Sequence, residues 1–337
     1  MTEMLFDFEE KKLREEIKNR NPKIVLLQLP EGLKPEAPHL ANIVERAGAL
    51  PIVSADPCYG ACDLADSEAK NLGADLIIHY GHSPMVIDSE IPVVYFEAKT
   101  RIDVKKVVMK ALSFLEPWQN IGLTTTVQHI EDLEDIKNIL ENSGKTVLIG
   151  DSGYLRYPGQ ILGCDFRNAQ IISENVEAYL FVGGGKFHAI GLALATEKPT
   201  IVADPYEQIV YPIEDQARRV TLQRWANISI AKQVKNFGIL ISLKTGQIKI
   251  KNALSIKEKL EKNNFDVTLF SLREVTPNAL MQFSGIEAFV NTACPRLSLD
   301  DAIYFEKPVL SINETLVMLG EMKWEDLLKK GWFENVI

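Results

Sequence analysis

The chain has 337 residues, 46% of them hydrophobic and 25% charged, a balance typical of a globular protein with two or three domains. Its net charge of −9 disfavours direct binding to nucleic acid, which needs a basic surface. The sequence has no run of about 18 uncharged apolar residues, so we expect no membrane span. The charged N-terminus lacks the apolar core of a signal peptide and indicates an amphipathic helix. We therefore expect a cytoplasmic protein with reduced cysteines.

One order of segments occurs three times along the chain. Each unit opens with a short apolar run, beginning at Lys23, Asn120 and Asn236. A helical pattern and a second apolar run follow in every unit. A third apolar run comes next, within residues 74–84, 177–189 and 286–298. A fourth run then follows a proline, within residues 91–98, 198–205 and 307–313. Continuous apolar strands that alternate with helices predict parallel sheets covered by helices.

The repeat predicts three Rossmann-like α/β domains, at residues 1–100, 101–210 and 211–337. The third domain begins with a long connecting helix that carries several basic residues. These residues have the spacing of one solvated helix face, and they are Arg218, Arg219, Arg224, Lys232 and Lys235.

Three of the four cysteines lie in different units of the repeat. Cys62 and Cys164 follow the second strand of their units, and Cys294 follows the third strand. Ligands of open parallel sheets bind beyond the carboxyl ends of the strands. Domains packed with these edges inward would bring the three thiols together. Thiolates favour an iron–sulfur cluster, zinc or Cu(I), and the spacing does not name the metal. Burial of each cysteine as a small apolar side chain is the alternative.

The residues beside the cysteines support a shared site. Gly60 and Gly163 would let the backbone approach a bulky cluster closely. Pro295 predicts a helix start, so Cys294 would lie near a helix N-terminus, where the dipole favours the thiolate. Cys58 has no counterpart in the other units, and we expect that it is not a ligand.

Several polar loops follow predicted strands and could hold the carboxylate or amino group of a small ligand. The candidates are Glu31, Gly32, Gly183, Gly184, Gly185, Lys186, Lys244, Thr245, Gly246, Gln247 and Arg296. An ordinary turn, or a surface arginine in the case of Arg296, is the alternative at each position. His79 and His82 follow a strand without an evident third ligand. We interpret them as hydrogen-bonded structural histidines.

The motifs YGACD around Cys62, QILGCDF around Cys164 and NTACPR around Cys294 resemble those of the diphthamide-synthesis family. This family comprises archaeal non-standard radical-SAM enzymes and two eukaryotic synthase subunits. The resemblance runs essentially from end to end and includes LPEGL, HYGHSP and VGGGKFH. The additional Cys58 departs from the family pattern.

The resemblance implies that Cys62, Cys164 and Cys294 hold a 4Fe–4S cluster whose open iron faces S-adenosylmethionine. It implies cleavage of the bond from sulfur to the aminocarboxypropyl carbon, with methylthioadenosine as one product. The 3-amino-3-carboxypropyl radical would add to the imidazole C2 of a histidine on translation elongation factor 2. The family also implies a homodimer and an electron donor that the sequence does not identify.

Two alternatives remain open from the sequence. Quinolinate synthase also resembles a triplicated α/β unit with a three-cysteine 4Fe–4S cluster, but its open iron acts as a Lewis acid in a dehydration. A non-catalytic subunit with a zinc site is the other alternative. Iron and sulfide analysis distinguishes zinc from a cluster, and assays with S-adenosylmethionine distinguish the two enzymes.

Overall fold

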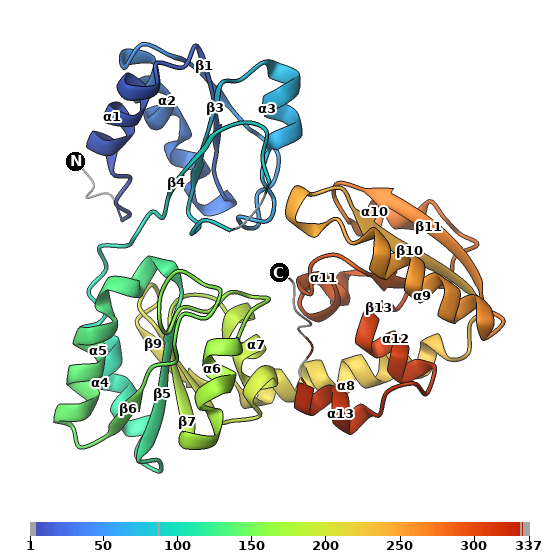
Figure 1. Cartoon of the computed structure of the whole chain (residues 1–337). Coiled ribbons are helices and arrows are strands. Elements are labelled where there is room, and N and C mark those ends of the chain that lie inside the picture. The colour runs from blue at the N-terminus through green and yellow to red at the C-terminus, as the bar shows by residue number, and fades with distance from the viewer. Residues whose placement is uncertain (1–4, 86–87, 331, 333–337) are drawn as a thin grey trace.

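The computed structural model describes residues 5–85, 88–330 and 332, and its three α/β lobes surround a common centre (Figure 1). In the first lobe the strand order is β2-β1-β3-β4, and all pairs are parallel. Its strands are β1 (Ile24–Gln28), β2 (Leu50–Val53), β3 (Leu76–Tyr80) and β4 (Val93–Phe96). Its helices are α1 (Glu10–Arg20), η1 (Glu31–Glu36), α2 (Ala37–Arg46) and α3 (Asp66–Leu72).

The second lobe repeats this order as β6-β5-β7-β8 and adds an antiparallel edge strand, β9. Its strands are β5 (Asn120–Thr125), β6 (Thr146–Leu148), β7 (Ala178–Val182), β8 (Thr200–Asp204) and β9 (Ile209–Pro212). Its helices are α4 (Lys105–Phe114), η2 (Val127–Asp132), α5 (Leu133–Asn142), α6 (Arg167–Ile172), η3 (Ser173–Asn175) and α7 (Phe187–Thr196). The sequence analysis missed β9, because its short run has an exposed, non-alternating pattern.

The third lobe has the order β11-β10-β12-β13, again fully parallel. Its strands are β10 (Asn236–Ser242), β11 (Asp266–Leu272), β12 (Ala288–Asn291) and β13 (Val309–Ser311). Its helices are α8 (Glu214–Ala231), η4 (Thr245–Gln247), α9 (Ile250–Lys262), α10 (Pro277–Met281), α11 (Arg296–Leu299), η5 (Asp301–Tyr304), α12 (Ile312–Met318) and α13 (Trp324–Lys330). The predicted fold class and the threefold repeat are confirmed. The exact domain boundaries stay a prediction.

Helix positions follow the apolar pattern of the sequence. The N-terminal helix α1 buries Leu13 and Ile17 on one face, as an amphipathic helix should. The long helix α8 is also confirmed, but its basic residues do not form one solvated face. Arg224 is fully buried, and Lys235 lies beyond the end of the helix. In the described part of the chain, no helix combines the length and apolarity needed to cross a membrane.

The lobes differ in how they pack. One apolar cluster joins the second and third lobes, running from Ile161 through α7, α8 and α9 to Trp332. The apolar clusters of the first lobe contain only residues of that lobe. The first lobe meets the second through polar contacts, for example Tyr157 Oη donating to Glu97 Oε2 at 2.9 Å and Gln160 Nε2 donating to Ser83 Oγ at 3.1 Å. The first lobe is therefore the more separable unit.

An acidic side chain stands at the same place in each sheet, just before the third strand. Asp75 accepts hydrogen bonds from the backbone N–H groups of Lys23 and Ile24, which lead into β1. Glu177 and Glu287 do the same for the two residues that begin β5 and β10. These backbone donors lower the pKa of all three carboxyl groups. This acidic position, which also recurs in all three units, was not predicted from the sequence.

We predict that this trio contributes to acid sensitivity. A carboxyl group whose pKa is lowered by folding stabilises the protein above its unfolded pKa, and this contribution disappears as the pH falls through the folded pKa. The urea midpoint of the D75N/E177Q/E287Q variant should therefore fall less between about pH 5 and pH 3 than that of the parent chain. Parallel pH profiles for both proteins would contradict this prediction.

Candidate functional site

The three cysteines predicted to share a site come together from three lobes. Cys62 lies between β2 and α3, Cys164 between β6 and α6, and Cys294 between β12 and α11. Burial is the largest cause that raises the pKa of each thiol, to about 12 for Cys294. The charge of Cys62 also raises the pKa of both other thiols, and Cys294 adds to the effect on Cys164. This mutual influence requires that the thiols lie close together, and their ionisation requires a compensating cation.

The spacing of the sulfurs fits a cluster better than a single ion. Tetrahedral zinc would bring its thiolates within roughly 4 Å of one another. Among the described residues, the three cysteines do not form a group whose ligand atoms all lie within 4.8 Å. In a cluster each thiolate binds a different iron, so the ligands stand farther apart.

The loop at residues 244–247 of the third lobe holds the Cys62 loop of the first. Gly246 N donates to Cys62 O at 2.8 Å, and Gln247 Nε2 donates to Cys62 Sγ at 3.3 Å. Thr245 Oγ1 donates to Leu64 O at 3.3 Å. A Cβ atom at Gly246 would lie 2.7 Å from Cys62 Cα, so only glycine permits this approach. These contacts between lobes could not be read from the sequence, and ligand binding at this loop stays a prediction.

Lys244 forms ion pairs with two carboxylates of the protein. Its buried ammonium lies 2.8 Å from Asp63 Oδ2 and 2.8 Å from Glu274 Oε1. It also lies 4.3 Å from the centroid of the Tyr59 ring. Two carboxylates and a ring face surround the charge, so Lys244 joins the first and third lobes next to Cys62.

A pocket opens beside Cys294. Its lining residues come from the first and third lobes and are Tyr59, Ser242, Lys244, Gln247, Arg273, Glu274, Val275, Cys294, Arg296, Leu297 and Asp301. Arg296 lies 3.4 Å from Asp300 and 3.5 Å from Asp301, and its Nε makes no hydrogen bond within the described residues. Its charge acts to lower the pKa of Cys294. Arg296 is thus the cation with donor capacity left for an anionic ligand.

The other predicted ligand loops do not line this pocket. Gly183 to Lys186 connect β7 to α7, where Gly184 packs against Tyr206 and Lys186 is exposed. Glu31 and Gly32 lie in η1, and Glu31 pairs with Lys34 at 2.6 Å. Lys34 donates to the carbonyl groups of residues 55 and 56, at the start of the first cysteine loop. Ligand binding at these two loops stays a prediction.

Two local expectations concern the residues beside Cys164 and Cys294. A Cβ atom at Gly163 would lie 2.0 Å from the Phe187 ring, so this glycine allows the Cys164 loop to pack on α7. The N–H group and charge of Arg296 do lower the pKa of Cys294, but burial and the charge of Cys62 outweigh them. The helix start therefore acts on Cys294 in the predicted direction, although burial raises the net pKa of the thiol.

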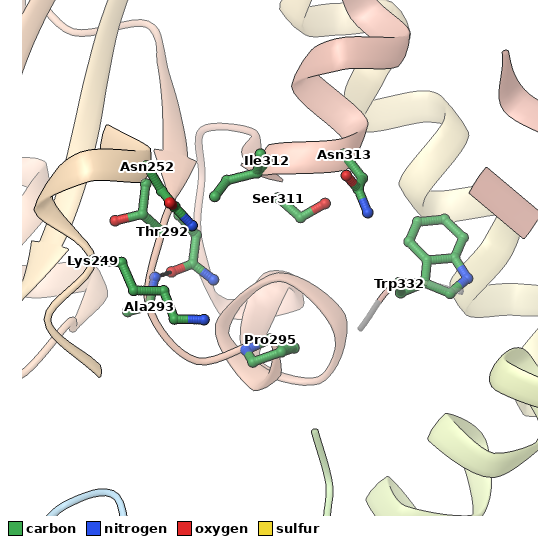
Figure 2. Close-up of a pocket in the computed structure, with 10 residues that line it drawn as sticks. Lys249, Asn252, Thr292, Ala293, Pro295, Ser311, Ile312, Asn313 and Trp332 are labelled. Atoms are coloured by element: carbon green, nitrogen blue, oxygen red, sulfur yellow. Dashed lines mark hydrogen bonds between the residues drawn. The ribbon is translucent and has the colours of Figure 1, made fainter. Parts of the chain in front are cut away.

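A second cavity lies in the third lobe, and its lining includes Ala293 and Pro295, the two chain neighbours of Cys294 (Figure 2). Asn313 and Trp332 stand on one side of it, and Lys249 and Ala293 stand on the opposite side. Asn313 Oδ1 and Trp332 Nε1 are buried without a hydrogen-bond partner among the described residues. The charge of Lys249 acts to lower the pKa of Cys164. The sequence offered no signal for this cavity, because its lining comes from four separate segments.

Asn291 is a further residue that sequence reasoning missed. Its Nδ2 donates to Cys294 O at 2.8 Å, and its Oδ1 accepts from Ala293 N at 2.8 Å. The side chain therefore fixes the turn that presents Cys294. An asparagine at the end of a strand is typical of such turns, and this signal was available in NTACPR.

Three parallel α/β lobes, each with one cysteine at the centre, define a class of proteins built to hold one shared metal centre. The family described as "Putative diphthamide synthesis protein" matches residues 29–328, and the chain belongs to this family. The resemblance seen in the sequence is thus confirmed.

Relatives and solved structures agree with this assignment. The chain is 36% identical to the 2-(3-amino-3-carboxypropyl)histidine synthase of Pyrococcus horikoshii, over 96% of this chain and 95% of that protein. It is 32% identical to subunit 1 of the Schizosaccharomyces pombe synthase, over 97% of this chain and 77% of the relative. The crystal structure of Dph2 from Pyrococcus horikoshii with a 4Fe–4S cluster matches with a TM-score of 0.89 and 35% identity, over 99% of this chain and 95% of that one.

These matches confirm the class of enzyme and its cofactor. The named relatives are synthases that form 2-(3-amino-3-carboxypropyl)histidine, so the expected transferase class in diphthamide biosynthesis is confirmed at the level of the family. The expected 4Fe–4S cofactor is confirmed by the cluster in the Dph2 structure.

Proposed function

We propose that Cys62, Cys164 and Cys294 hold a 4Fe–4S cluster and that the chain transfers the 3-amino-3-carboxypropyl group of S-adenosylmethionine. The acceptor would be the imidazole C2 of a histidine on translation elongation factor 2. The convergence of three thiols beside a pocket with an available arginine carries this proposal. A homodimer, a separate electron donor and a cytoplasmic location stay predictions.

The net transfer is balanced without another reactant. The bond from sulfur to the aminocarboxypropyl carbon breaks, a carbon–carbon bond to the imidazole forms, and methylthioadenosine and one proton leave. When bound, the cluster would supply one electron to the sulfonium and would take one electron back when the radical adduct on the imidazole loses its proton, so the transfer would be redox-neutral. The protein's own part is to hold the sulfonium so that one of its three bonds faces the open position. Gln247, which donates to Cys62 Sγ, would stabilise the more negative charge of a reduced site.

The product of cleavage tests this proposal. Cluster-loaded protein reduced with dithionite should release methylthioadenosine from S-adenosylmethionine. Release of mainly 5′-deoxyadenosine would point to ordinary radical-SAM chemistry. Quinolinate formed from dihydroxyacetone phosphate and iminoaspartate would instead support the dehydratase alternative.

We predict that Arg296 binds the carboxylate of S-adenosylmethionine. A carboxylate beside an anionic cluster needs a cationic donor, and Arg296 lines the same pocket as Cys294. Loss of one charge-assisted hydrogen bond costs about 1.5–3 kcal/mol, or roughly tenfold to a hundredfold in affinity. Calorimetry on cluster-loaded Arg296→Ala should show this weakening.

Lys105→Ala is the matched control, because it removes an exposed cation on α4 of the second lobe, outside the pocket and outside the predicted ligand loops. Its affinity should equal that of the parent chain. Unchanged affinity in Arg296→Ala would contradict this prediction, and a larger loss in Lys186→Ala would place the carboxylate at the loop between β7 and α7.

A further inference from the structure

A second group of metal-binding side chains lies in the first lobe. Cys58, His79 and His82 each place a ligand atom so that all three atoms lie within 4.8 Å of one another. Cys58 is 2% exposed and His79 is 0% exposed. No other group of this kind occurs among the described residues. The sequence analysis interpreted the two histidines as structural because Cys58, 21 positions before His79, was not evident as the third member.

The hydrogen bonds around His79 fix which of its nitrogens is free. Gln28 Nε2 donates to Asp63 O at 2.6 Å, and Gln28 Oε1 accepts from Ala65 N at 3.1 Å. The amide of Gln28 is therefore oriented, and its Oε1 faces His79 Nδ1 at 2.9 Å. Because Oε1 can only accept, Nδ1 of His79 carries the proton, and Nε2 presents its lone pair. His79 Nε2 lies 2.9 Å from His82 Nδ1.

This arrangement is typical of a metal-binding histidine. Such a histidine usually donates its other ring N–H to an oxygen acceptor, which fixes the tautomer and the ring orientation. Gln28 supplies that acceptor from the neighbouring strand, where it pairs in register with His79. Tyr95 pairs with His79 from β4, on the other side of β3, and the centroids of the two rings lie 5.1 Å apart.

We propose that Cys58, His79 and His82 bind one zinc ion, at a site separate from the cysteines of the three-lobe centre. Zinc bound to nitrogen at about 2.0–2.1 Å and to sulfur at about 2.3 Å needs ligand atoms roughly 3.3–3.8 Å apart. The atoms therefore need only small shifts. The fourth position is filled by water, as in sites with three protein ligands.

The protonation states are compatible with this proposal. Burial lowers the pKa of both histidines, to about 4 for His82, so both rings are neutral at physiological pH. Neutral imidazole is the form that binds metal. Cys58 would release its thiol proton on binding, and the ring proton of His82 would move from Nδ1, which faces His79, to Nε2, so that Nδ1 can bind the ion. Burial raises the pKa of the Cys58 thiol to about 12, and the opposed charges of Asp63 and Lys244 act on it as well, so the thiolate needs the bound cation to form.

The zinc content of the cluster-loaded full-length protein tests the site. Anaerobically purified protein, equilibrated with zinc and then freed of excess ion, should hold one zinc per chain in addition to its iron. Cys58→Ser and His82→Gln should each weaken zinc binding by at least about 100-fold, since loss of even an outer-shell partner costs 10- to 100-fold. Both variants should keep their iron.

Cys294→Ser is the matched control, because it should lose iron and keep zinc. X-ray absorption at the zinc edge of the parent protein should show one sulfur and two imidazole nitrogens. This measurement tests the ligands even if a variant fails to fold. Full zinc content in both Cys58→Ser and His82→Gln would overturn the site. Loss of iron in folded Cys58→Ser would also overturn it, since Cys58 would then be a cluster ligand. Because iron and zinc are counted separately, failure of this site is distinguishable from failure of the proposed transferase.

Discussion

Cys62→Ala, Cys164→Ala and Cys294→Ala should each lose the iron–sulfur cluster and all release of methylthioadenosine. Each cysteine comes from a different lobe, so the remaining two thiols cannot supply the missing ligand from their own loops. The variants, purified without oxygen, should lack the brown absorbance and should contain little iron or sulfide. Iron analysis and the visible spectrum check this result.

Cys58→Ala is the control for this series and should retain the full cluster. It lies in the same loop as Cys62 but has no equivalent in the other lobes. Retention of a complete cluster by Cys294→Ala would show that the three-lobe centre is not the iron site. Equal iron loss in Cys58→Ala would show that the first loop supplies a different ligand from the one proposed.

The largest effect on stability should come from the buried pair of Arg224 and Glu314. Both side chains are fully buried, and Arg224 Nε donates to Glu314 Oε1 at 2.6 Å. Arg224 also donates to Val309 O at 2.6 Å, so one side chain joins α8, β13 and α12. Removing one partner of a buried pair leaves a buried charge without compensation, which costs about 3–5 kcal/mol. Arg224→Met and Glu314→Gln should each lower the free energy of unfolding by this amount.

The double variant and a surface pair provide the controls for this prediction. R224M/E314Q should lose less than the sum of the two single variants, because neither charge is left alone. Asp266→Asn breaks the exposed pair with Lys235, whose atoms lie 3.4 Å apart, and should change stability by less than about 1 kcal/mol. Urea unfolding measures all four variants. Equal effects for the buried and exposed pairs would contradict the role given to Arg224.

The fold was largely predictable because its signals are local. Every parallel strand of the three sheets begins within a few residues of a predicted apolar run, since buried strands need continuous apolar sequence. Edge strand β9 was missed because its residues are half exposed. Burial of Arg224 was also missed, because its partner Glu314 stands 90 positions away and no local pattern connects them.

The site was predictable only in part. The repeat placed three cysteines at strand ends, and the structure brings them to one centre. The roles of individual neighbours depended on contacts between lobes. Ligand binding by Gln247, expected because it is polar and follows a strand, stays a prediction, whereas its hydrogen bond to Cys62 of another lobe could not be read from the sequence. The group of Cys58, His79 and His82 was missed for the same reason, since only folding brings the first cysteine loop to β3.

The separate apolar core of the first lobe has a mechanical consequence. The first lobe meets the others through polar contacts, such as Tyr157 with Glu97 and Lys244 with Asp63, whereas the other two lobes share one continuous apolar core. We therefore expect a hinge motion in which the second and third lobes move as one rigid body and the first lobe moves as the other. Such opening would carry Cys62 away from Cys164 and Cys294 and break the contacts at Gly246 and Gln247. A bound cluster, ligated from all three lobes, would hold the first lobe against the other two. Protein without the cluster should therefore show faster amide exchange along the contacts between the first lobe and the other two.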